Sequence, residues 1–219
     1  MNASRSFVPA AGQDRWLPLY DPLTKLLGAP SAHLALIEQA NLAPGHRVLD
    51  IGCGTGSLAV TLKSRHPQVQ VVALDPDEHA LARAGRKAER AHATIEFVRG
   101  FADTIPFPDA SFDRVFSSFM LHHLTSAEKA ATLADVRRVL KSDGSFHLLD
   151  FAAPDDHHRH GVLARLLHRG EHLHDHATDT IVAMLGAAGL GNAELVAIRR
   201  TLFGPIAFHR AKTGVKTER

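Results

Sequence analysis

A glycine-rich loop at the end of a short apolar strand constrains this chain more than any other feature. The segment Arg47 to Ile51 (RVLDI) is predicted to be a strand, and Gly52, Gly54 and Gly56 follow it directly. Glycine is needed where a chain turns sharply and where its backbone must approach a ligand without a Cβ. A helix expected from Gly56 to about Arg65 would direct its unpaired N–H groups at such a ligand. The loop therefore predicts an α/β fold with a ligand site at the carboxyl ends of its strands.

A carboxylate follows the loop by about twenty positions. Asp75 comes directly after the β-branched run Val69 to Leu74 (VQVVAL), which is predicted to be the second strand. An acidic residue there can accept hydrogen bonds from ribose hydroxyls. Its alternative role is to cap the helix that begins near Pro76 and Asp77. Together, the loop and this residue indicate an adenosine-containing cofactor.

Two details separate the possible cofactors. The dinucleotide pattern G-x-G-x-x-G would require a glycine where Ser57 stands. Asp50 precedes the loop, where it would face the negatively charged pyrophosphate of a dinucleotide. A carboxylate suits the ammonium group of S-adenosylmethionine better than it suits a phosphate. The spacing and the charge therefore favour S-adenosylmethionine over NAD.

The rest of the chain alternates short apolar runs with helical patterns, which predicts βαβ units and a parallel sheet. Ser31 is expected to cap a helix that runs to about Asn41. A later helix is expected over Ser126 to Leu140, closed by Ser142-Asp143-Gly144, with a strand over Ser145 to Phe151. The remaining expected elements are strands at 94–98 and 112–118, helices at 77–91 and 177–188, and two final strands near 194–199 and 203–209. The last two strands are separated only by a turn, which predicts an antiparallel hairpin at the sheet edge.

The segment VLDIGCGTGSLA resembles the first motif of class I S-adenosylmethionine-dependent methyltransferases. The stretch GFADTIPFPDASFDRVFSSFMLHHL, Gly100 to Leu124, is similar to the second signature of the ubiquinone/menaquinone C-methyltransferase-like group. The resemblance covers roughly residues 45–151. It implies a Rossmann-like α/β fold: a mostly parallel seven-stranded sheet with helices on both faces and an antiparallel C-terminal hairpin. It also implies S-adenosylmethionine as the methyl donor and S-adenosylhomocysteine as the product.

The resemblance also implies cofactor-binding roles for particular residues. Asp50 would lie near the methionine amino group, and Asp75 would bind the ribose. The other implied residues are Gly52, Cys53 and Gly54 at the methionyl and ribose portion, Pro76, Ala102 and Asp103 at the adenine, and Ser118 at the end of the strand facing the cofactor. The chain departs from the family at Phe101, where many members carry Asp or Asn, so the adenine amino group would rely on Asp103 or on backbone groups.

Catalytic candidates follow the fourth expected strand. His122 or His123 would take a proton from the methyl acceptor or orient it, and the alternative is that both form only the pocket wall. Tyr20, the single tyrosine of the chain, would either cover the cofactor or serve packing alone. Arg83, Arg86, Lys87 and Arg90 recur at helical spacing, which favours a solvated helix face over an RNA site.

Histidine is abundant, with 16 residues in the chain, and seven of them lie between Asp155 and His176. Their spacing matches neither HExxH nor a Cys/His framework, so a lid over the acceptor is favoured over a metal site, and no metal is expected. We expect one domain over 1–219. It would comprise an N-terminal helical cover (1–44), a cofactor-binding core (45–151), and a His-rich lid with C-terminal edge strands (152–219).

Composition narrows the function. A formal net charge of +2 gives no reason to expect a nucleic-acid partner. The first residues lack the apolar core of a secretory signal, no apolar run is long enough to span a bilayer, and Cys53 is the single cysteine, so a cytoplasmic location is expected. The sequence predicts methyl transfer to a small-molecule acceptor by in-line displacement. The alternatives are a nucleic-acid methyltransferase, an NAD-type oxidoreductase and a non-catalytic cofactor-binding module.

Overall fold

The computed structural model describes residues 29–152, 178–201 and 204–214. Seven strands within these ranges form one sheet in the order β3-β2-β1-β4-β5-β7-β6. The strands are β1 (Arg47–Ile51), β2 (Gln70–Asp75), β3 (Glu96–Arg99), β4 (Phe112–Ser118), β5 (Leu140–Phe151), β6 (Leu190–Thr201) and β7 (Gly204–Thr213). The helices are α2 (Ala29–Glu38), α3 (Ser57–Arg65), α4 (Glu78–Arg90), the short 3-10 helix η2 (Leu121–His123), α5 (Ser126–Val139) and α7 (Thr178–Ala187).

Strand direction divides the sheet into two parts. Strands β1 to β5 pair in parallel. Strand β7 runs antiparallel between β5 and β6. The predicted fold class, a mostly parallel sheet with an antiparallel C-terminal hairpin, is confirmed. The strand order reverses beside β1, because β2 and β3 extend to one side of it and β4 to the other. Open α/β sheets bind their ligands at such a switch point, at the carboxyl ends of the strands.

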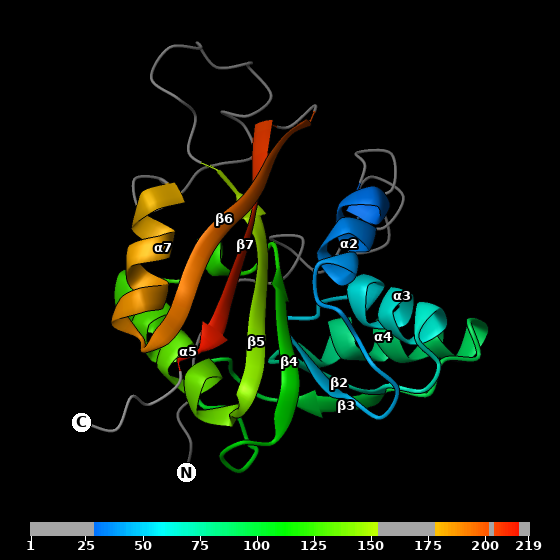
Figure 1. Cartoon of the computed structure of the whole chain (residues 1–219). Helices are drawn as coiled ribbons and strands as arrows, with labels where there is room; N and C mark the ends of the chain where they lie inside the picture. The colour runs from blue at the N-terminus through cyan, green and yellow to red at the C-terminus, as the bar shows by residue number, and fades with distance from the viewer. Residues whose placement is uncertain (1–28, 153–177, 202–203, 215–219) are drawn as a thin grey trace.

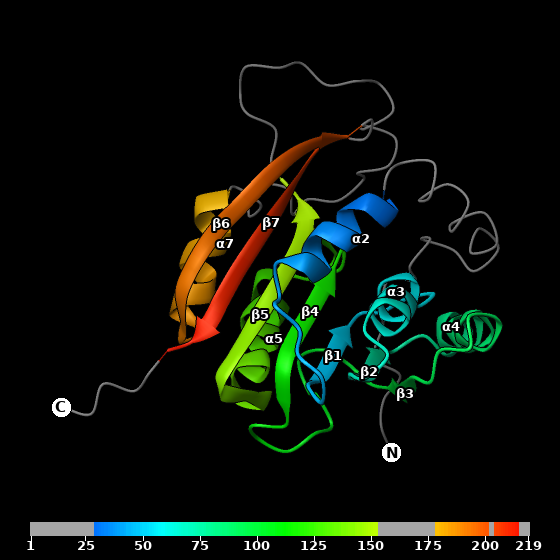
Figure 2. The ribbon, with the colours of Figure 1, turned by 45° about the vertical axis from the view of Figure 1, so that its right-hand side comes forward.

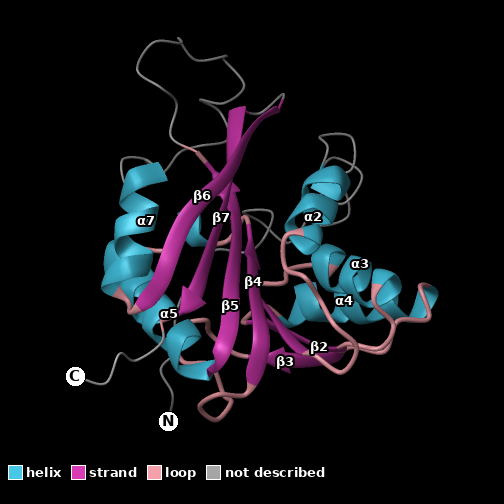
Figure 3. Ribbon diagram, in the orientation of Figure 1, coloured by secondary structure: helices cyan, strands magenta, loops and turns pink. Residues whose placement is uncertain are grey.

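Helices cover both faces of the sheet (Figures 1, 2 and 3). Helices α2, α3 and α4 lie on one face, and α5 and α7 lie on the other. Successive strand residues point to opposite faces, so each central strand supplies both cores. In β4, Val115 packs toward α5, while Phe116 packs toward α2 and α3. Burial on both faces explains why these strands read as almost continuous apolar runs. None of the described helices has the length and apolar character needed to cross a membrane.

Two sequence-based element boundaries are wrong. Ser142-Asp143-Gly144 do not close a helix, because α5 ends at Val139 and β5 already begins at Leu140. Phe112 pairs with Leu140 and Arg114 with Ser145, so β5 carries extra residues between these two pairs. The extension is held by tertiary contacts that a local pattern does not reveal. The Thr213 hydroxyl lies 3.0 Å from the Lys141 carbonyl, and Lys141 Nζ donates to Asp113.

The other boundary is the start of α2. Ala29 is already helical, so Ser31 lies inside the first turn and does not cap the helix. The final strands are also longer than expected, and the first residue of the second expected strand, Phe203, lies outside the described residues. The hairpin itself stands, since β6 and β7 pair from Leu190↔Thr213 to Thr201↔Gly204.

Candidate functional site

The glycine loop adopts a backbone conformation that residues with a side chain rarely adopt. Gly52, Gly54 and Gly56 all have positive φ, of 66°, 52° and 75°. A Cβ on Gly56 would lie 2.8 Å from Cβ of Ala84 in α4, and one on Gly52 would lie 2.3 Å from Cγ of Met120. The loop thus needs glycine for its turn and for the close approach of α4.

Hydrogen bonds fasten this loop to the end of β2. The N–H groups of Gly52 and Cys53 donate to the Leu74 carbonyl, at 2.8 and 3.0 Å. The Gly54 N–H donates to Oδ2 of Asp75 at 2.8 Å, and the Asp77 N–H donates to its Oδ1 at 2.9 Å. Each Asp75 oxygen keeps further acceptor capacity, since a carboxylate has about four lone-pair sites.

Two neighbouring acids have different roles at the end of β2. The Asp77 side chain caps α4 by accepting from the N–H groups of His79 and Ala80. The alternative that Asp75 caps this helix is therefore wrong. Asp75 ends β2 as predicted and is held by the glycine loop. It is 8% exposed, so the carboxylate is largely buried where the strand ends.

Asp50 lies behind the loop as a buried carboxyl group. It is 1% exposed, and its Oδ2 atom has no hydrogen-bond partner. Burial, reinforced by the nearby charge of Asp75, raises the pKa of Asp50 to about 8. A buried acid with an unpaired oxygen is costly unless a donor or a cation meets it. The pair of acids therefore suits a cationic ligand and opposes a phosphate.

Cys53 is a half-buried loop residue. Burial, with the charges of Asp50 and Asp75 beside it, raises the pKa of the thiol well above its ordinary value. Cysteine nucleophiles act as thiolates, which a lowered pKa favours. The environment therefore supports the interpretation of Cys53 as a small residue of the loop.

The residues expected at the adenine lie near the same edge of the sheet. Gly100, which follows β3, donates its N–H to the Asp75 carbonyl at 3.1 Å. Ala102 packs against the core beside the sheet, and Asp103 accepts from the Thr104 hydroxyl at 3.3 Å. The Pro76 carbonyl accepts from Arg99 at 3.3 Å. These contacts bring the loop after β3 to the end of β2.

Ser118, at the end of β4, has a partner that the sequence did not indicate. Its Oγ lies 3.0 Å from Nε2 of His33 in α2. Burial, with the charge of Lys87 nearby, lowers the pKa of His33 to about 4. His33 is thus a neutral imidazole at physiological pH. No spacing in the sequence relates two residues that are 85 positions apart.

The chain turns sharply after Ser118. Phe119 has a φ of 54°, which bulky side chains rarely adopt. Its N–H donates to the Leu149 carbonyl at 2.8 Å, and its ring lies 5.0 Å from that of Phe151. Strained backbone of this kind persists only where the surroundings hold it, and it is common at functional sites.

His122 is oriented by a buried acid at the end of β5. Its Nδ1 lies 2.7 Å from Oδ1 of Asp150, and its backbone N–H donates to Oδ2 at 3.1 Å. Asp150 is 2% exposed. A carboxylate only accepts, so Nδ1 carries the hydrogen and Nε2 carries the lone pair of the neutral ring. Sequence reasoning did not identify Asp150, because it read as part of an apolar strand.

The second histidine stacks on the first. The ring centroids of His122 and His123 lie 3.9 Å apart. The edge of the His122 ring also meets Phe151, at a centroid distance of 5.1 Å. The structure thus brings both sequence-predicted histidines to the carboxyl edge of the sheet, where Asp150 orients His122.

Lys87 corrects the interpretation of the basic helix face. Its Nζ lies 2.8 Å from Oγ of Ser57 and 3.2 Å from Oγ1 of Thr55. This side chain therefore reaches the start of α3 and the glycine loop. A pattern of basic residues on one helix cannot reveal that a neighbouring loop comes within reach of one of them.

Some predictions fall outside the described residues. They are the role of Tyr20, the helical cover over 1–28 and the His-rich lid at 155–176. Within the ranges that the structure covers, no three His, Cys, Asp or Glu side chains gather as a metal site.

Comparison with known proteins identifies the same motif region. Residues 48–144 match a family model described as a methyltransferase domain. A demethylmenaquinone methyltransferase of Deinococcus radiodurans is 36% identical over 140 residues, which are 63% of this chain and 57% of that protein. The chain spans about half the length of the first curated relatives it matches, 47% and 58%.

Solved structures share the fold. The YcgJ protein of Bacillus subtilis matches with a TM-score of 0.67 and 22% identity, over 84% of this chain and 99% of that one. Phosphoethanolamine N-methyltransferase 2 of Haemonchus contortus, solved with S-adenosylhomocysteine, matches with a TM-score of 0.68 and 16% identity, over 84% and 53%. The resemblance predicted from the motifs is confirmed.

Proposed function

We propose that this chain, whose residues 48–144 are a methyltransferase domain, transfers a methyl group from S-adenosylmethionine to a small-molecule acceptor. The observation that carries the proposal is the pair of acids around the glycine loop. Asp50 has a buried oxygen without a partner, and Asp75 is held beside it by the loop. A ligand with an ammonium group and a ribose satisfies both acids, whereas a pyrophosphate would bring no cation to Asp50 and would be repelled by the Asp75 carboxylate.

The cofactor contacts follow from this arrangement. Asp50 binds the methionine ammonium, and Asp75 accepts hydrogen bonds from the ribose hydroxyls. The remaining proposed cofactor residues are Gly52, Cys53 and Gly54 at the loop, Pro76, Ala102 and Asp103 at the adenine, Ser118 at the end of β4, and Tyr20. Asp77 has no cofactor role in this proposal, since it caps α4.

The protein contributes binding and orientation to the reaction. S-adenosylmethionine supplies a sulfonium-bound methyl group that is already activated for displacement. The acceptor atom forms a bond to this carbon while the carbon–sulfur bond breaks and its electron pair stays on sulfur. Holding the two reactants in line is worth roughly 7–11 kcal/mol of the barrier. The rings of Phe119 and Phe151 lie together beside the turn after β4. In this proposal, a flat apolar acceptor packs against them.

His122 is the proposed proton acceptor for an acceptor that must lose a proton. Asp150 holds Nδ1, so Nε2 is the basic atom and takes the proton released from the acceptor. Asp150 stabilises the imidazolium that results and acts as a positioning residue. His123, the second candidate from the sequence, stacks on His122 and serves as its support.

The acceptor class rests on several supports. The Deinococcus relative is named a demethylmenaquinone methyltransferase, so its name gives a quinone as the methyl acceptor. The chain has a formal net charge of only +2, which gives no reason to expect a nucleic-acid substrate. The proposal includes one domain over 1–219, with acceptor selection by segments 1–44 and 155–176, and action in the cytoplasm.

Two measurements test the proposal against its rivals. Calorimetry with S-adenosylhomocysteine, S-adenosylmethionine and NAD should show binding of the first two alone. Binding of NAD without any response to S-adenosylhomocysteine would favour an oxidoreductase. A screen of metabolite extracts for labelled methyl transfer should then yield a small methylated product. Cofactor binding without turnover in any extract would favour a non-catalytic module, and label in nucleic acid would favour the nucleic-acid alternative.

A further inference from the structure

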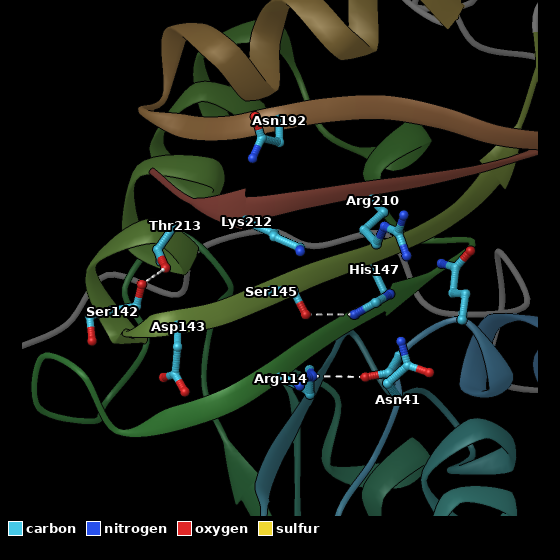
Figure 4. Close-up of a pocket in the computed structure, with 12 residues that line it drawn as sticks. Asn41, Arg114, Ser142, Asp143, Ser145, His147, Asn192, Arg210, Lys212 and Thr213 are labelled. Carbon is cyan, nitrogen blue, oxygen red and sulfur yellow. Dashed lines mark hydrogen bonds between the residues drawn. The ribbon is translucent and has the colours of Figure 1, made fainter. Parts of the chain in front are cut away.

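A polar cavity of about 450 Å³ lies on the face of the sheet that α2 covers. It is formed by the N-terminal halves of β4 and β5, the antiparallel strand β7 and the end of α2 (Figure 4). The lining residues that carry the argument are Arg114, Asp143, Ser145, His147, Arg210 and Lys212. Its volume falls within the range of small-molecule sites, about 300–1,000 Å³.

The register of the sheet brings cationic side chains together here. Arg114 on β4 is the partner of Ser145 on β5, which is the partner of Lys212 on β7. In the next row along the same face, His147 on β5 is the partner of Arg210. Side chains directly across neighbouring strands lie about 4.5–5.5 Å apart at their Cβ atoms. Three cations thus line one cavity, and Asp143 is the single acid among its lining residues.

The cations have unequal partners. Arg114 donates from Nε to the Ala40 carbonyl at 2.8 Å and from one terminal nitrogen to the carbonyl of Asp113. Arg210 donates from Nε and from one terminal nitrogen to Oε1 of Glu194, at 2.9 and 2.5 Å. No hydrogen bond or ion pair holds the side chain of Lys212 within the described part of the chain. Each guanidinium has five donors, so both arginines retain donors for a further acceptor.

His147 makes the cavity wall unusual. It is 1% exposed, stacks on Phe116 at a centroid distance of 5.1 Å, and bonds through Nε2 to Ser145 at 2.8 Å. Its Nδ1 has no hydrogen-bond partner. Burial, with Arg114 and Arg210 nearby, lowers the pKa of this imidazole to about 3. Two cationic side chains thus lie near a neutral imidazole, which carries no charge to offset theirs.

We propose that this cavity is a second ligand site, which binds a small oxyanion such as a phosphate group through Arg210, Lys212 and Arg114. A phosphate offers several strong acceptors to these donors, and guanidinium groups match its geometry. The site is separate from the methyl-transfer edge, because Arg114 lies four residues before Ser118, roughly 13 Å along the strand. Helix α2 and the turn that follows it contact both places, with His33 of α2 on Ser118 and Ala40 of the turn on Arg114.

The test is calorimetric titration of inorganic pyrophosphate into the full chain, with and without S-adenosylhomocysteine. The second condition fills the methyl-transfer site, and binding should be the same in both. Arg210→Gln and Lys212→Gln should each weaken pyrophosphate binding about tenfold, the loss expected for one charge-assisted contact. Arg200→Gln, an exposed cation of β6 outside the cavity, should leave it unchanged.

A variant that is expected to strengthen binding makes the test more specific. Glu194→Gln removes the carboxylate paired with Arg210 and should strengthen binding by about two- to fivefold. Thermal melting of each variant, together with an unchanged ¹⁵N imidazole signal of His147, establishes that the sheet is intact. The proposal is overturned if pyrophosphate does not bind the wild type. It is also overturned if Arg210→Gln and Lys212→Gln bind as well as Arg200→Gln.

Discussion

Nδ1 of His122 lies 2.7 Å from Oδ1 of Asp150, at the point where β4 and β5 end side by side. The two residues are 28 positions apart, His122 in the short helix η2 after β4 and Asp150 near the end of β5. The backbone N–H groups of His122 and Phe151 also donate to this carboxylate, at 3.1 and 2.8 Å. The Asp150 carboxylate thus fixes the imidazole ring of His122 and also the backbone turn on which His122 lies.

The first prediction concerns this pair. His122→Asn should lower methyl transfer by about 10²–10⁴-fold if the acceptor must lose a proton, because that is the usual range for a general base. Asp150→Asn should lower turnover as well and should shift the pH profile, since the amide can also present a donor to the ring. Labelled methyl transfer into the active extract measures both effects. His123→Asn is the matched control, and equal losses for His122→Asn and His123→Asn would contradict the assignment.

The second prediction separates the two acids after β2. Asp75→Ala should weaken S-adenosylhomocysteine binding by more than tenfold, because a charge-assisted hydrogen bond is worth about 1.5–3 kcal/mol. Asp77→Ala should instead lower stability by about 0.5–2 kcal/mol through loss of the α4 cap, with little change in affinity. Calorimetry and denaturant melts distinguish these effects. Equal dissociation constants for the two variants would reject the ribose role of Asp75.

The third prediction follows from the buried state of Asp50. Its pKa of about 8 means that the carboxyl is protonated at neutral pH before ligand binds. An ammonium group would lower that pKa, so binding must release a proton. Affinity for S-adenosylmethionine should therefore rise by up to about tenfold per pH unit toward pH 8 and then level off. Calorimetry in buffers of different ionisation enthalpy should detect the proton. Asp50→Asn should abolish both the release and the pH dependence, and their persistence in this variant would exclude Asp50 as their source.

The fourth prediction concerns acid stability. His33 and His147 have pKa values lowered to about 4 and about 3, against about 6.5 in an unfolded chain. Between pH 6.5 and 4 the unfolded state binds more protons at these positions, so stability falls as pH falls, by about 1.4 kcal/mol per unit and group. Asp50 contributes with the opposite sign. Because its pKa is raised in the folded protein, its contribution to stability falls as pH rises toward 8. Denaturant melts of the Asp50→Asn variant with and without His147→Gln isolate the contribution of His147, because the other titrating groups are common to both proteins. His147→Gln should reduce the slope by about 1.4 kcal/mol per pH unit, and an unchanged slope would show that His147 does not remain neutral.

The fifth prediction addresses the His-rich segment 155–176, which lies outside the described residues. As a lid over the acceptor, this segment would affect turnover or acceptor choice, and a partial deletion should leave cofactor affinity unchanged. Chelator treatment should leave the melting temperature unchanged, because a structural metal would couple its binding to folding. A large drop in melting temperature that zinc restores would establish a metal site instead.

Local patterns in the sequence determined the fold class and the cofactor loop. Apolar runs of strand length, helical periodicity and the glycines from Gly52 to Gly56 each act within a few residues, so the printed order of amino acids is enough to read them. The same holds for Asp75, which a fixed interval separates from the loop, and for the Asp77 cap.

Only the tertiary structure decided which distant side chains meet. The partners His33 and Ser118, His122 and Asp150, and Lys87 and Ser57 come from different elements, and no sequence period relates them. The polar cavity depends on register, because Arg114, Ser145 and Lys212 become neighbours only when three strands pair in one alignment. A shift of one residue would turn each of these side chains to the other face of the sheet. The packing of both cores selects that alignment, and the packing is a property of the whole chain.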